Sequence, residues 1–292
     1  MRRPTDPVTD RRPRAPPGAD LSAGPGSLPR PESASAILEV DLDAIAANWA
    51  LLCERHRAGA VGAVVKADGY GLGARPIAAR LFREGCRHFF VASIGEALAI
   101  REAVPGAMIA VLNGLIAGDE AAYADRGILP VLGSLAEIET WRAEAGRRGR
   151  ALPAFLHIDT GMSRLGLDGR ELEILSGELG RLGGIALSYV MTHLVSSEVA
   201  DDPLNELQRL RFAEACSRLP NVARCFANSS GIFLGDRFGS DLARPGAALF
   251  GINPTPGRPN PMRPVVRLLG RVLQVRTIEA GATVGYNATW RA

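Results

Sequence analysis

Lysine is almost absent from this sequence of 292 residues. Of its 34 lysine and arginine residues, Lys66 is the only lysine. Arginine serves equally well as a surface cation, but it stays protonated in proteins, whereas lysine can lose its proton and form a Schiff base with a carbonyl. Lys66 ends an apolar run and enters the glycine-rich stretch Ala67–Gly73, where a side chain would be delivered to a site. Chance survival of one lysine is the alternative interpretation.

Other scarce features narrow the class of protein. The four cysteines, Cys53, Cys86, Cys216 and Cys225, form no Cys-x-x-Cys pair, which predicts free thiols of a reducing compartment. The net charge is only +3 and the arginines are spread along the chain, which disfavours nucleic-acid binding. No apolar run approaches the roughly 20 residues of a membrane-spanning helix, and no hydrophobic signal segment follows the N-terminal arginines. We therefore expect a cytoplasmic enzyme or binding protein.

The first 36 residues differ in composition from the rest of the chain. They hold eight of the 20 prolines and almost no large apolar side chains. A segment of this composition cannot bury enough surface to fold, so residues 1–36 are expected to form a disordered tail.

Between residues 37 and 260, short apolar runs alternate with amphipathic stretches of helical period. Such runs separated by helices are typical of a parallel sheet covered on both faces. Eight of them predict a closed (β/α)8 TIM barrel over residues 37–260. The alternative is a doubly wound open sheet, but Gly69–Gly73 lacks the Gly-x-Gly-x-x-Gly spacing that usually accompanies it. The expected strands are Val61–Lys66, His88–Ser93, Met108–Asn113, Ile128–Gly133, Pro153–Asp159, Ile185–His193, Val222–Asn228 and Ala247–Gly251.

The pattern changes again over residues 261–292. Three strand-like segments, Pro264–Leu269, Gly270–Thr277 and Ala282–Tyr286, follow one another with no helix between them. We expect a β-rich C-terminal domain to begin here. Three short strands are too few for an independent sheet domain, so residues 261–292 are expected to be an incomplete one.

Polar residues follow the expected barrel strands at their C-terminal ends, where barrel enzymes place their active sites. Backbone amides and hydroxyls after the late strands are suitable donors for a phosphate. A phosphate site beside a lone strand-end lysine indicates pyridoxal phosphate, whose aldehyde needs an amine and whose phosphate needs an anchor. The residues concerned are Lys66 after the first strand, Asp159–Arg164 after the fifth, Thr192–His193 at the sixth, Asn228–Gly231 after the seventh, and Arg244–Gly246 just before the eighth.

These motifs resemble, in order and spacing, those of the bacterial alanine racemase family, the fold-type III pyridoxal-phosphate enzymes. The resemblance extends from about Ile37 to Ala292. The segments that carry it are Ala63–Gly71, Ile158–Gly166, Met191–His193, Ala227–Ser230, Arg244–Gly246 and Val284–Tyr286.

The resemblance implies a role for each matching residue around the cofactor. Lys66 would hold pyridoxal phosphate covalently, and Tyr70, Ser229 and the amides near Asn228 and Gly246 would bind its phosphate. His193 would lie against the pyridine ring and Arg244 would face the pyridine nitrogen. Arg164 would contact the phenolic oxygen and place the substrate carboxylate. Such a permanently charged arginine leaves the pyridine nitrogen unprotonated, which weakens the cofactor as an electron sink.

The resemblance also implies the reaction and the assembly. Lys66 and Tyr286 would be two bases on opposite faces of the substrate α-carbon, interconverting L- and D-alanine and supplying D-alanine for peptidoglycan. Because Tyr286 would come from the partner subunit, the active site would be shared within a homodimer. Two departures from the family are His157, where many members have a lysine that is often carbamylated, and a C-terminus that ends several tens of residues early.

Other functions stay open at this point. A serine or broad-specificity racemase would share the same motifs. A decarboxylase of this fold would pair the pyridine nitrogen with a carboxylate, against Arg244, and an aldolase would need a metal site, for which no His/Cys/Asp cluster is present. A non-catalytic pyridoxal-phosphate-binding barrel would lack both a β domain and Tyr286.

Overall fold

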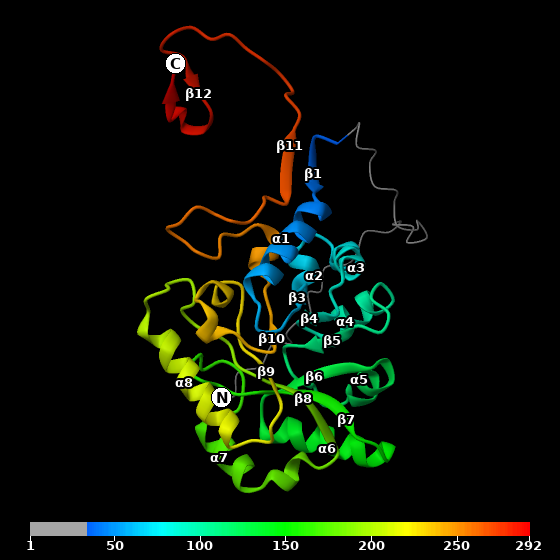
Figure 1. The fold of residues 1–292 in the computed structure, drawn as a ribbon. Coiled ribbons are helices and arrows are strands. Elements are labelled where there is room, and N and C mark those ends of the chain that lie inside the picture. Colours follow the sequence, from blue (N-terminus) through cyan, green and yellow to red (C-terminus); the bar gives the residue numbers. More distant parts are fainter. Residues whose placement is uncertain (1–33) are drawn as a thin grey trace, which may run out of the picture. The chain divides into compact units, whose positions relative to one another are not determined.

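The computed structural model describes residues 34–292 (Figure 1), so most of the expected disordered tail lies outside the described residues. The described chain divides into two compact units. One comprises residues 39–267, and the other comprises residues 268–292 together with the segment that ends at Leu38. Within residues 34–292, no helix is both long and apolar enough to cross a membrane.

Residues 39–267 form the predicted parallel barrel, which confirms the closed fold over the open sheet. The strand order is β2-β10-β9-β8-β7-β6-β5-β4-β3. Strands β2 and β3 are two halves of one segment, separated only by Gly62; the first half pairs with β10 and the second with β4, which closes the barrel. The strands are β2 (Ala60–Val61), β3 (Ala63–Val64), β4 (His88–Val91), β5 (Met108–Val111), β6 (Ile128–Leu132), β7 (Leu152–His157), β8 (Ile185–Met191), β9 (Ala223–Cys225) and β10 (Leu242–Ala243).

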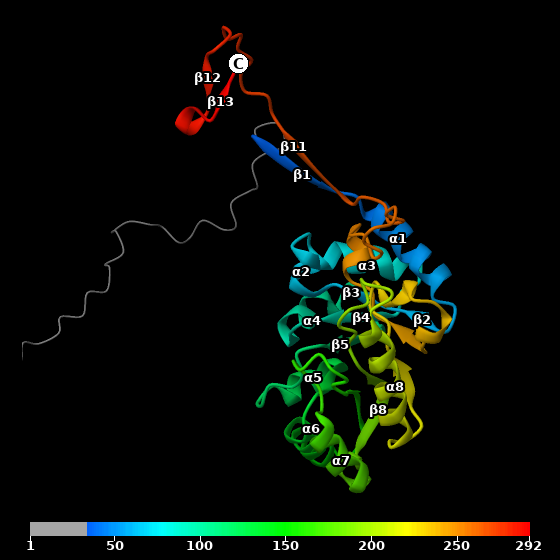
Figure 2. The ribbon, with the colours of Figure 1, turned by 90° about the vertical axis from the view of Figure 1, so that its left-hand side faces the viewer.

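Helices cover the outside of these strands (Figures 1 and 2). Several begin where the side chain of a serine or aspartate caps the free amides of the first turn: Ser93, Ser134 and Asp168 accept from the amides of Glu96, Glu137 and Glu171. The helices are α1 (Leu42–Arg55), α3 (Ala74–Glu84), α4 (Ile94–Arg101), α5 (Glu120–Arg126), α6 (Leu135–Arg148), α7 (Gly169–Gly177) and α8 (Pro203–Ser217), with short 3-10 turns η2 (Leu179–Leu182), η3 (Gly231–Phe233) and η4 (Asp236–Phe238).

The core has two layers because successive strand side chains point to opposite faces. In β4, Phe89 packs outward against the helices, whereas Phe90 packs into the barrel interior against Phe155 of β7. The interior cluster also contains Val64, Ala110, Leu129, Val131, Met191, Cys225 and Leu242. The filled interior confines any site to one end of the barrel.

The eighth strand lies earlier in the chain than expected. Residues Ala247–Phe250 form the 3-10 turn η5, and the strand is β10, so the predicted strand Ala247–Gly251 is wrong. A short buried apolar run does not distinguish a strand from a turn, since both bury their side chains. As a result Arg244 directly follows β10 and lies at a strand's C-terminal end, like the other predicted site residues.

The second unit, and the two points where the chain passes between it and the barrel unit, contain short strands whose side chains are exposed or partly exposed. Strand β1 (Ala36–Val40) pairs with β11 (Val266–Gly270), and β12 (Thr283–Val284) pairs antiparallel with β13 (Trp290–Arg291). The expected strand Gly270–Thr277 does not form, and the side chains of Val272, Leu273 and Val275 are exposed there.

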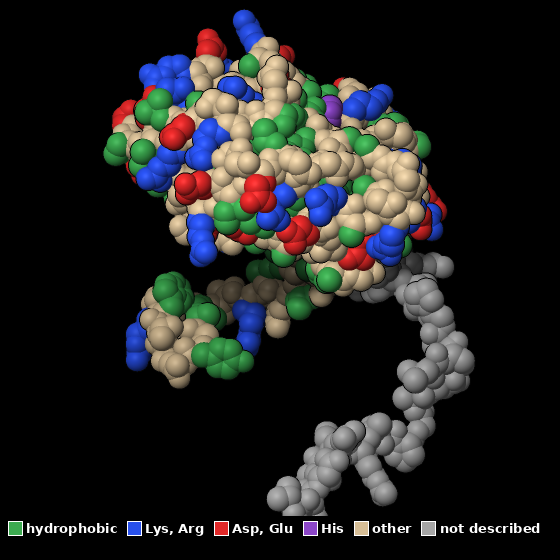
Figure 3. All heavy atoms as spheres, turned by 90° about the horizontal axis from the view of Figure 1, so that it is seen from below, with side chains coloured by type: hydrophobic (Ala, Val, Ile, Leu, Met, Phe, Trp, Pro, Cys, Tyr) green, Lys and Arg blue, Asp and Glu red, His purple; other side chains and the backbone are tan. Residues whose placement is uncertain are grey.

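Arginine and acidic side chains are interspersed on the surface seen in Figure 3. Arg148, for example, pairs with both Glu144 and Asp125, and Arg181 pairs with Glu139 and Glu178. The face seen in this view therefore carries charges of both signs.

Candidate active site

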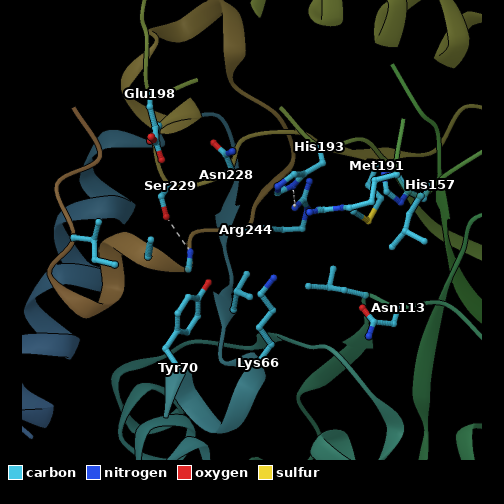
Figure 4. A pocket seen from close by; sticks show the side chains of 18 of the residues that line it. Lys66, Tyr70, Asn113, His157, Met191, His193, Glu198, Asn228, Ser229 and Arg244 are labelled. Atoms are coloured by element: carbon cyan, nitrogen blue, oxygen red, sulfur yellow. Dashed lines mark hydrogen bonds between the residues drawn. The ribbon is translucent and has the colours of Figure 1, made fainter. Parts of the chain in front are cut away.

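A cavity of about 400 Å³ opens at the C-terminal ends of the barrel strands (Figure 4). Of the nine residues that the sequence analysis assigned to the site, all except Tyr286 line it. The lining consists of Val64, Lys66, Tyr70, Leu112, Asn113, His157, Arg164, Leu165, Met191, His193, Glu198, Asn228, Ser229, Ser230, Arg244, Gly246, Ala247, Ile252 and Asn253.

Lys66 stands at the start of a left-handed turn, α2 (Lys66–Tyr70). Residues 67–70 all have φ between 49° and 66°, a conformation that costs a residue other than glycine roughly 1–2 kcal/mol. Neighbouring carboxylates hold the turn: Glu96 accepts from the amide of Ala67, and Asp68 accepts from the amide of Ala74. The result is that Lys66 and Tyr70 point side by side into the cavity (Figure 4).

Opposite Tyr70, the chain around Gly246 comes too close for any side chain. A Cβ atom at Gly246 would lie 2.2 Å from the Tyr70 Oη atom. The Ser229 hydroxyl accepts from the amides of Gly246 and Ala248 at 3.0 and 3.1 Å. Because Ser229 Oγ accepts from both amides, its own hydroxyl proton and that of Tyr70 are left as donors on this side of the cavity, and donors of this kind can bind a phosphate.

Asn228 fixes the loop that carries this group. Its Oδ1 atom accepts from the Gly231 amide at 2.9 Å and from the Ser197 hydroxyl at 2.8 Å, and its Nδ2 atom donates to the Leu194 carbonyl. The side chain therefore joins the loop after β9 to the loop after β8, and Asn228 acts here through the backbone that it holds.

Arg244 is the most buried cation of the site, with 3% of its surface exposed. Its Nε atom donates to Cys225 Sγ at 3.0 Å, its Nη2 atom donates to the Thr192 carbonyl, and its Nη1 atom lies 3.4 Å from His193 Nδ1. Burial raises the pKa of Cys225 to about 11, so the thiol stays neutral at pH 7. None of these partners is a carboxylate. The positive charge of Arg244 is therefore not neutralised by the groups that it contacts, and it acts on the cavity.

The two histidines of the cavity are uncharged near neutral pH. Burial, followed by the charge of Arg244, lowers the pKa of His193 to about 3 and that of His157 to about 4. Because a guanidinium can only donate, His193 Nδ1 must be the acceptor, and the imidazole carries its proton on Nε2.

Comparison with known proteins decides the family. The family model "Alanine racemase, N-terminal domain" matches residues 40–254. The alanine racemase of Acidiphilium cryptum is 53% identical over 255 residues, which are 87% of this chain and 71% of that protein. The chain belongs to the alanine racemase family. It is thus an enzyme of the isomerase class.

Two further relatives support this assignment. The catabolic alanine racemase of Mesorhizobium japonicum is 50% identical over 89% of this chain and 68% of that protein. The crystal structure of alanine racemase from Bartonella henselae, described with covalently bound pyridoxal phosphate, superposes with a TM-score of 0.83 at 41% identity, covering 88% of this chain and 72% of that one.

In this alanine racemase family member, a tight turn presents Arg164 at the cavity. The Asp159 carboxylate accepts from the amides of Gly161, Met162 and Ser163, which fixes the loop after β7. Ser163 takes a left-handed φ of 55°, and the exposed Arg164 follows it. His157, 8% exposed, lines the same cavity from β7.

Tyr286 belongs to the second unit and is not among the residues that line the cavity of the barrel unit. It begins the 3-10 turn η6 (Tyr286–Ala288) of the second unit, and 97% of its surface is exposed. Its assignment as a base stays a prediction.

Two polar lining residues, Asn113 and Glu198, were not predicted from the sequence. Asn113 comes two residues after β5, and Glu198 lies in the loop after β8. The position of Asn113 at a strand end is a signal in the sequence, but the residue belongs to no recognised motif. Within the described chain, no group of three or more His, Cys, Asp or Glu side chains could hold a metal ion.

Proposed function

We propose that this chain binds pyridoxal phosphate and interconverts L- and D-alanine. The observation that carries the proposal is that the only lysine points into the cavity beside Tyr70, Ser229 and the Gly246 amide. Bound there, the cofactor would supply an aldehyde that condenses with amines and a conjugated ring that withdraws electron density from the substrate α-carbon. The donors present fit both of its ends: the Lys66 amine for the aldehyde, and the hydroxyls of Ser229 and Tyr70 for the phosphate.

Around the ring, Arg244 and His193 would determine which reactions are favoured. Arg244 is permanently charged, so beside the pyridine nitrogen it would keep that nitrogen unprotonated. This weakens the electron sink and favours a simple proton exchange over decarboxylation or elimination. His193 is neutral, and its Nε2 proton is available as a donor because Nδ1 faces Arg244.

Inversion at the α-carbon requires two bases on opposite faces, because one removes the proton and the other returns a proton from the far side. Lys66 would serve one face. For the other we propose Tyr286 of the partner subunit in a homodimer with a shared active site. The supporting observation is that Tyr286 is the most exposed tyrosine of the chain and is available to a second copy.

Alanine is the proposed substrate, with Arg164 binding its carboxylate. The relatives of 42–53% identity reported for most of this chain are named alanine racemases. Two relatives carry the name of a catabolic enzyme, so the supply of D-alanine to peptidoglycan stays a prediction. A cytoplasmic location is likewise a prediction. Serine or broader specificity is the alternative that competing substrates would test.

A non-catalytic pyridoxal-phosphate-binding protein is the second candidate, because the residues that line the cavity all belong to the barrel unit and Tyr286 is not one of them. Under this second candidate function, the chain would bind the cofactor through Lys66 in the same cavity, but the second base would be missing. The two candidates therefore differ in racemisation and not in cofactor binding.

One experiment separates these outcomes. The purified chain is incubated with pyridoxal phosphate, reduced with borohydride and digested, and in parallel D-alanine formed from L-alanine is measured by chiral chromatography. We expect one cofactor-modified peptide, containing Lys66, and racemisation. The Lys66→Arg variant, which keeps the charge but cannot condense with an aldehyde, should show neither. Labelling without racemisation supports the second candidate, and labelling retained in Lys66→Arg contradicts both.

A further inference from the structure

We propose that Gln208 is a positioning residue that holds His193 and Arg244 in place from behind the active site. Gln208 lies on helix α8, outside the barrel, and does not line the cavity. The proposal rests on the proposed function for its catalytic consequence, but its structural part concerns this chain alone.

The first observation is the set of hydrogen bonds that Gln208 makes. Its side chain is completely buried, with 0% exposed. Nε2 donates to the His193 carbonyl at 2.9 Å and to Thr160 Oγ1 at 3.0 Å, and Oε1 accepts from the Val195 amide at 2.9 Å. One amide thus holds the backbone at and directly after His193 together with the loop after β7.

A second link extends from this amide to Arg244. Thr160 Oγ1 lies 2.8 Å from Thr192 Oγ1, and the Thr192 carbonyl accepts from Arg244 Nη2. The chain of contacts therefore runs from Gln208 through two threonines to the guanidinium. The guanidinium in turn faces His193 Nδ1 (Figure 4).

Only an amide can make this set of contacts. It donates two hydrogen bonds and accepts one, whereas a carboxylate cannot donate and a thioether can do neither well. Loss of the Nε2 donor removes one hydrogen bond from the His193 carbonyl and one from Thr160 Oγ1. The strand end that carries His193 is then no longer held in place. A displacement of His193 by about 1 Å is enough to reduce catalysis by up to roughly 100-fold.

Asn48 on α1 offers a matched control for a purely structural role. It is 1% exposed, and its side chain likewise donates two hydrogen bonds and accepts one. Nδ2 donates to the Leu249 and Arg263 carbonyls, and Oδ1 accepts from the Arg263 amide. Neither partner is His193 or Arg244. Asn48→Leu and Gln208→Met therefore remove equal numbers of buried hydrogen bonds at different places.

The direct test is imidazole NMR on the full chain as purified. Because the sequence has only four histidines, long-range ¹H–¹⁵N spectra resolve each ring, and a His193→Asn sample assigns the signal. In the unaltered chain His193 should be neutral, with its proton on Nε2. In Gln208→Met and in the isosteric Gln208→Glu, we expect this tautomer signature to be lost and His193 to titrate about one unit or more higher, because the ring moves away from Arg244.

The activity measurement adds a second readout. In Gln208→Met, kcat should fall roughly 10- to 100-fold while KM for alanine changes little. In Asn48→Leu, the melting temperature should fall by the same amount, but kcat and KM should stay unchanged. If Gln208→Met does not fold, Thr160→Val, which removes only one link, should give the same His193 changes in smaller measure. His193 signals identical to those of the unaltered chain in every folded Gln208 and Thr160 variant would overturn the proposal. Absence of racemisation in the unaltered chain would instead contradict the proposed function, and the histidine comparison would still decide the role of Gln208.

Discussion

The hydroxyl of Tyr70 occupies the space that a side chain at Gly246 would need. A Cβ atom at Gly246 would lie 2.2 Å from Tyr70 Oη and 3.2 Å from Cζ. The φ of Gly246 is −125°, so the backbone itself would accept another residue, and only the close approach requires glycine. Two loops far apart in the sequence thus form one side of the cavity through a single contact.

Gly246→Ala should therefore weaken both the fold and cofactor binding. Overpacking of this kind costs about 1–3 kcal/mol, and displacement of Tyr70 should raise the Kd for pyridoxal phosphate at least about tenfold. Tyr70→Phe in the Gly246→Ala background removes the Oη atom and should restore part of the stability, because the Cζ contact remains. Urea unfolding and fluorescence titration of the cofactor measure the two effects. Strictly additive losses in the double variant would show that the contact is not the cause.

Substitution of Arg244 should change the charge state of His193. The Arg244 charge is the second cause, after burial, of the low pKa of His193. Arg244→Met should raise this pKa from about 3 toward its ordinary value of 6.5, whereas Arg244→Lys keeps a cation and should leave it low. NMR titration of His193 distinguishes the two variants. Equal values in both would assign the shift to burial alone.

The stability of the barrel should fall below pH 6.5, in part because of His157. The folded chain protonates His157 only near pH 4, whereas the unfolded chain does so near 6.5. Between these values the unfolded state binds more protons, so stability is complete above pH 6.5 and is lost as pH falls toward 4. By pH 4.5 the loss should reach about 2–3 kcal/mol from this residue.

His157→Leu should reduce that pH dependence. Urea unfolding at pH 7 and pH 4.5, followed by circular dichroism, measures the difference for each variant. His88→Leu is the control, since burial also lowers the pKa of His88 but the side chain is only partly buried. An unchanged pH dependence in His157→Leu would contradict a buried neutral histidine at this position.

Tyr286→Phe should affect the two enantiomers of alanine unequally. If Lys66 and the partner subunit's Tyr286 serve opposite faces, loss of the phenol removes proton abstraction from one enantiomer and spares the other. Solvent-deuterium incorporation into L- and D-alanine, followed by mass spectrometry, measures this. Tyr123→Phe, a change at a buried tyrosine away from the cavity, is the control. Equal losses for both enantiomers would exclude Tyr286 as a base for one face.

Residue type and local sequence pattern were enough to predict the barrel fold and most of the residues that line the cavity. Alternation of apolar runs and helices predicted the barrel, and strand-end position predicted that Lys66 and His193 would lie at one end of it. Arg244 was expected just before the eighth strand, and only the observed β10 puts it at a strand's C-terminal end. Two expected strands, Ala247–Gly251 and Gly270–Thr277, were wrong. The first error arose because apolar character alone does not separate a buried turn from a strand. Asn113 shows the converse, since it lies at a strand end but belongs to no recognised motif.

Only the tertiary structure decided how these residues act on one another. The contact of Gly246 with Tyr70, the low pKa of His193 beside Arg244, and the three hydrogen bonds of Gln208 all join segments that are distant in the chain. Such contacts depend on distance, burial and the direction of each donor, and none of these has a local signature in sequence. The sole lysine could thus be identified from composition, whereas the environment in which it reacts is set by packing at the open end of the barrel.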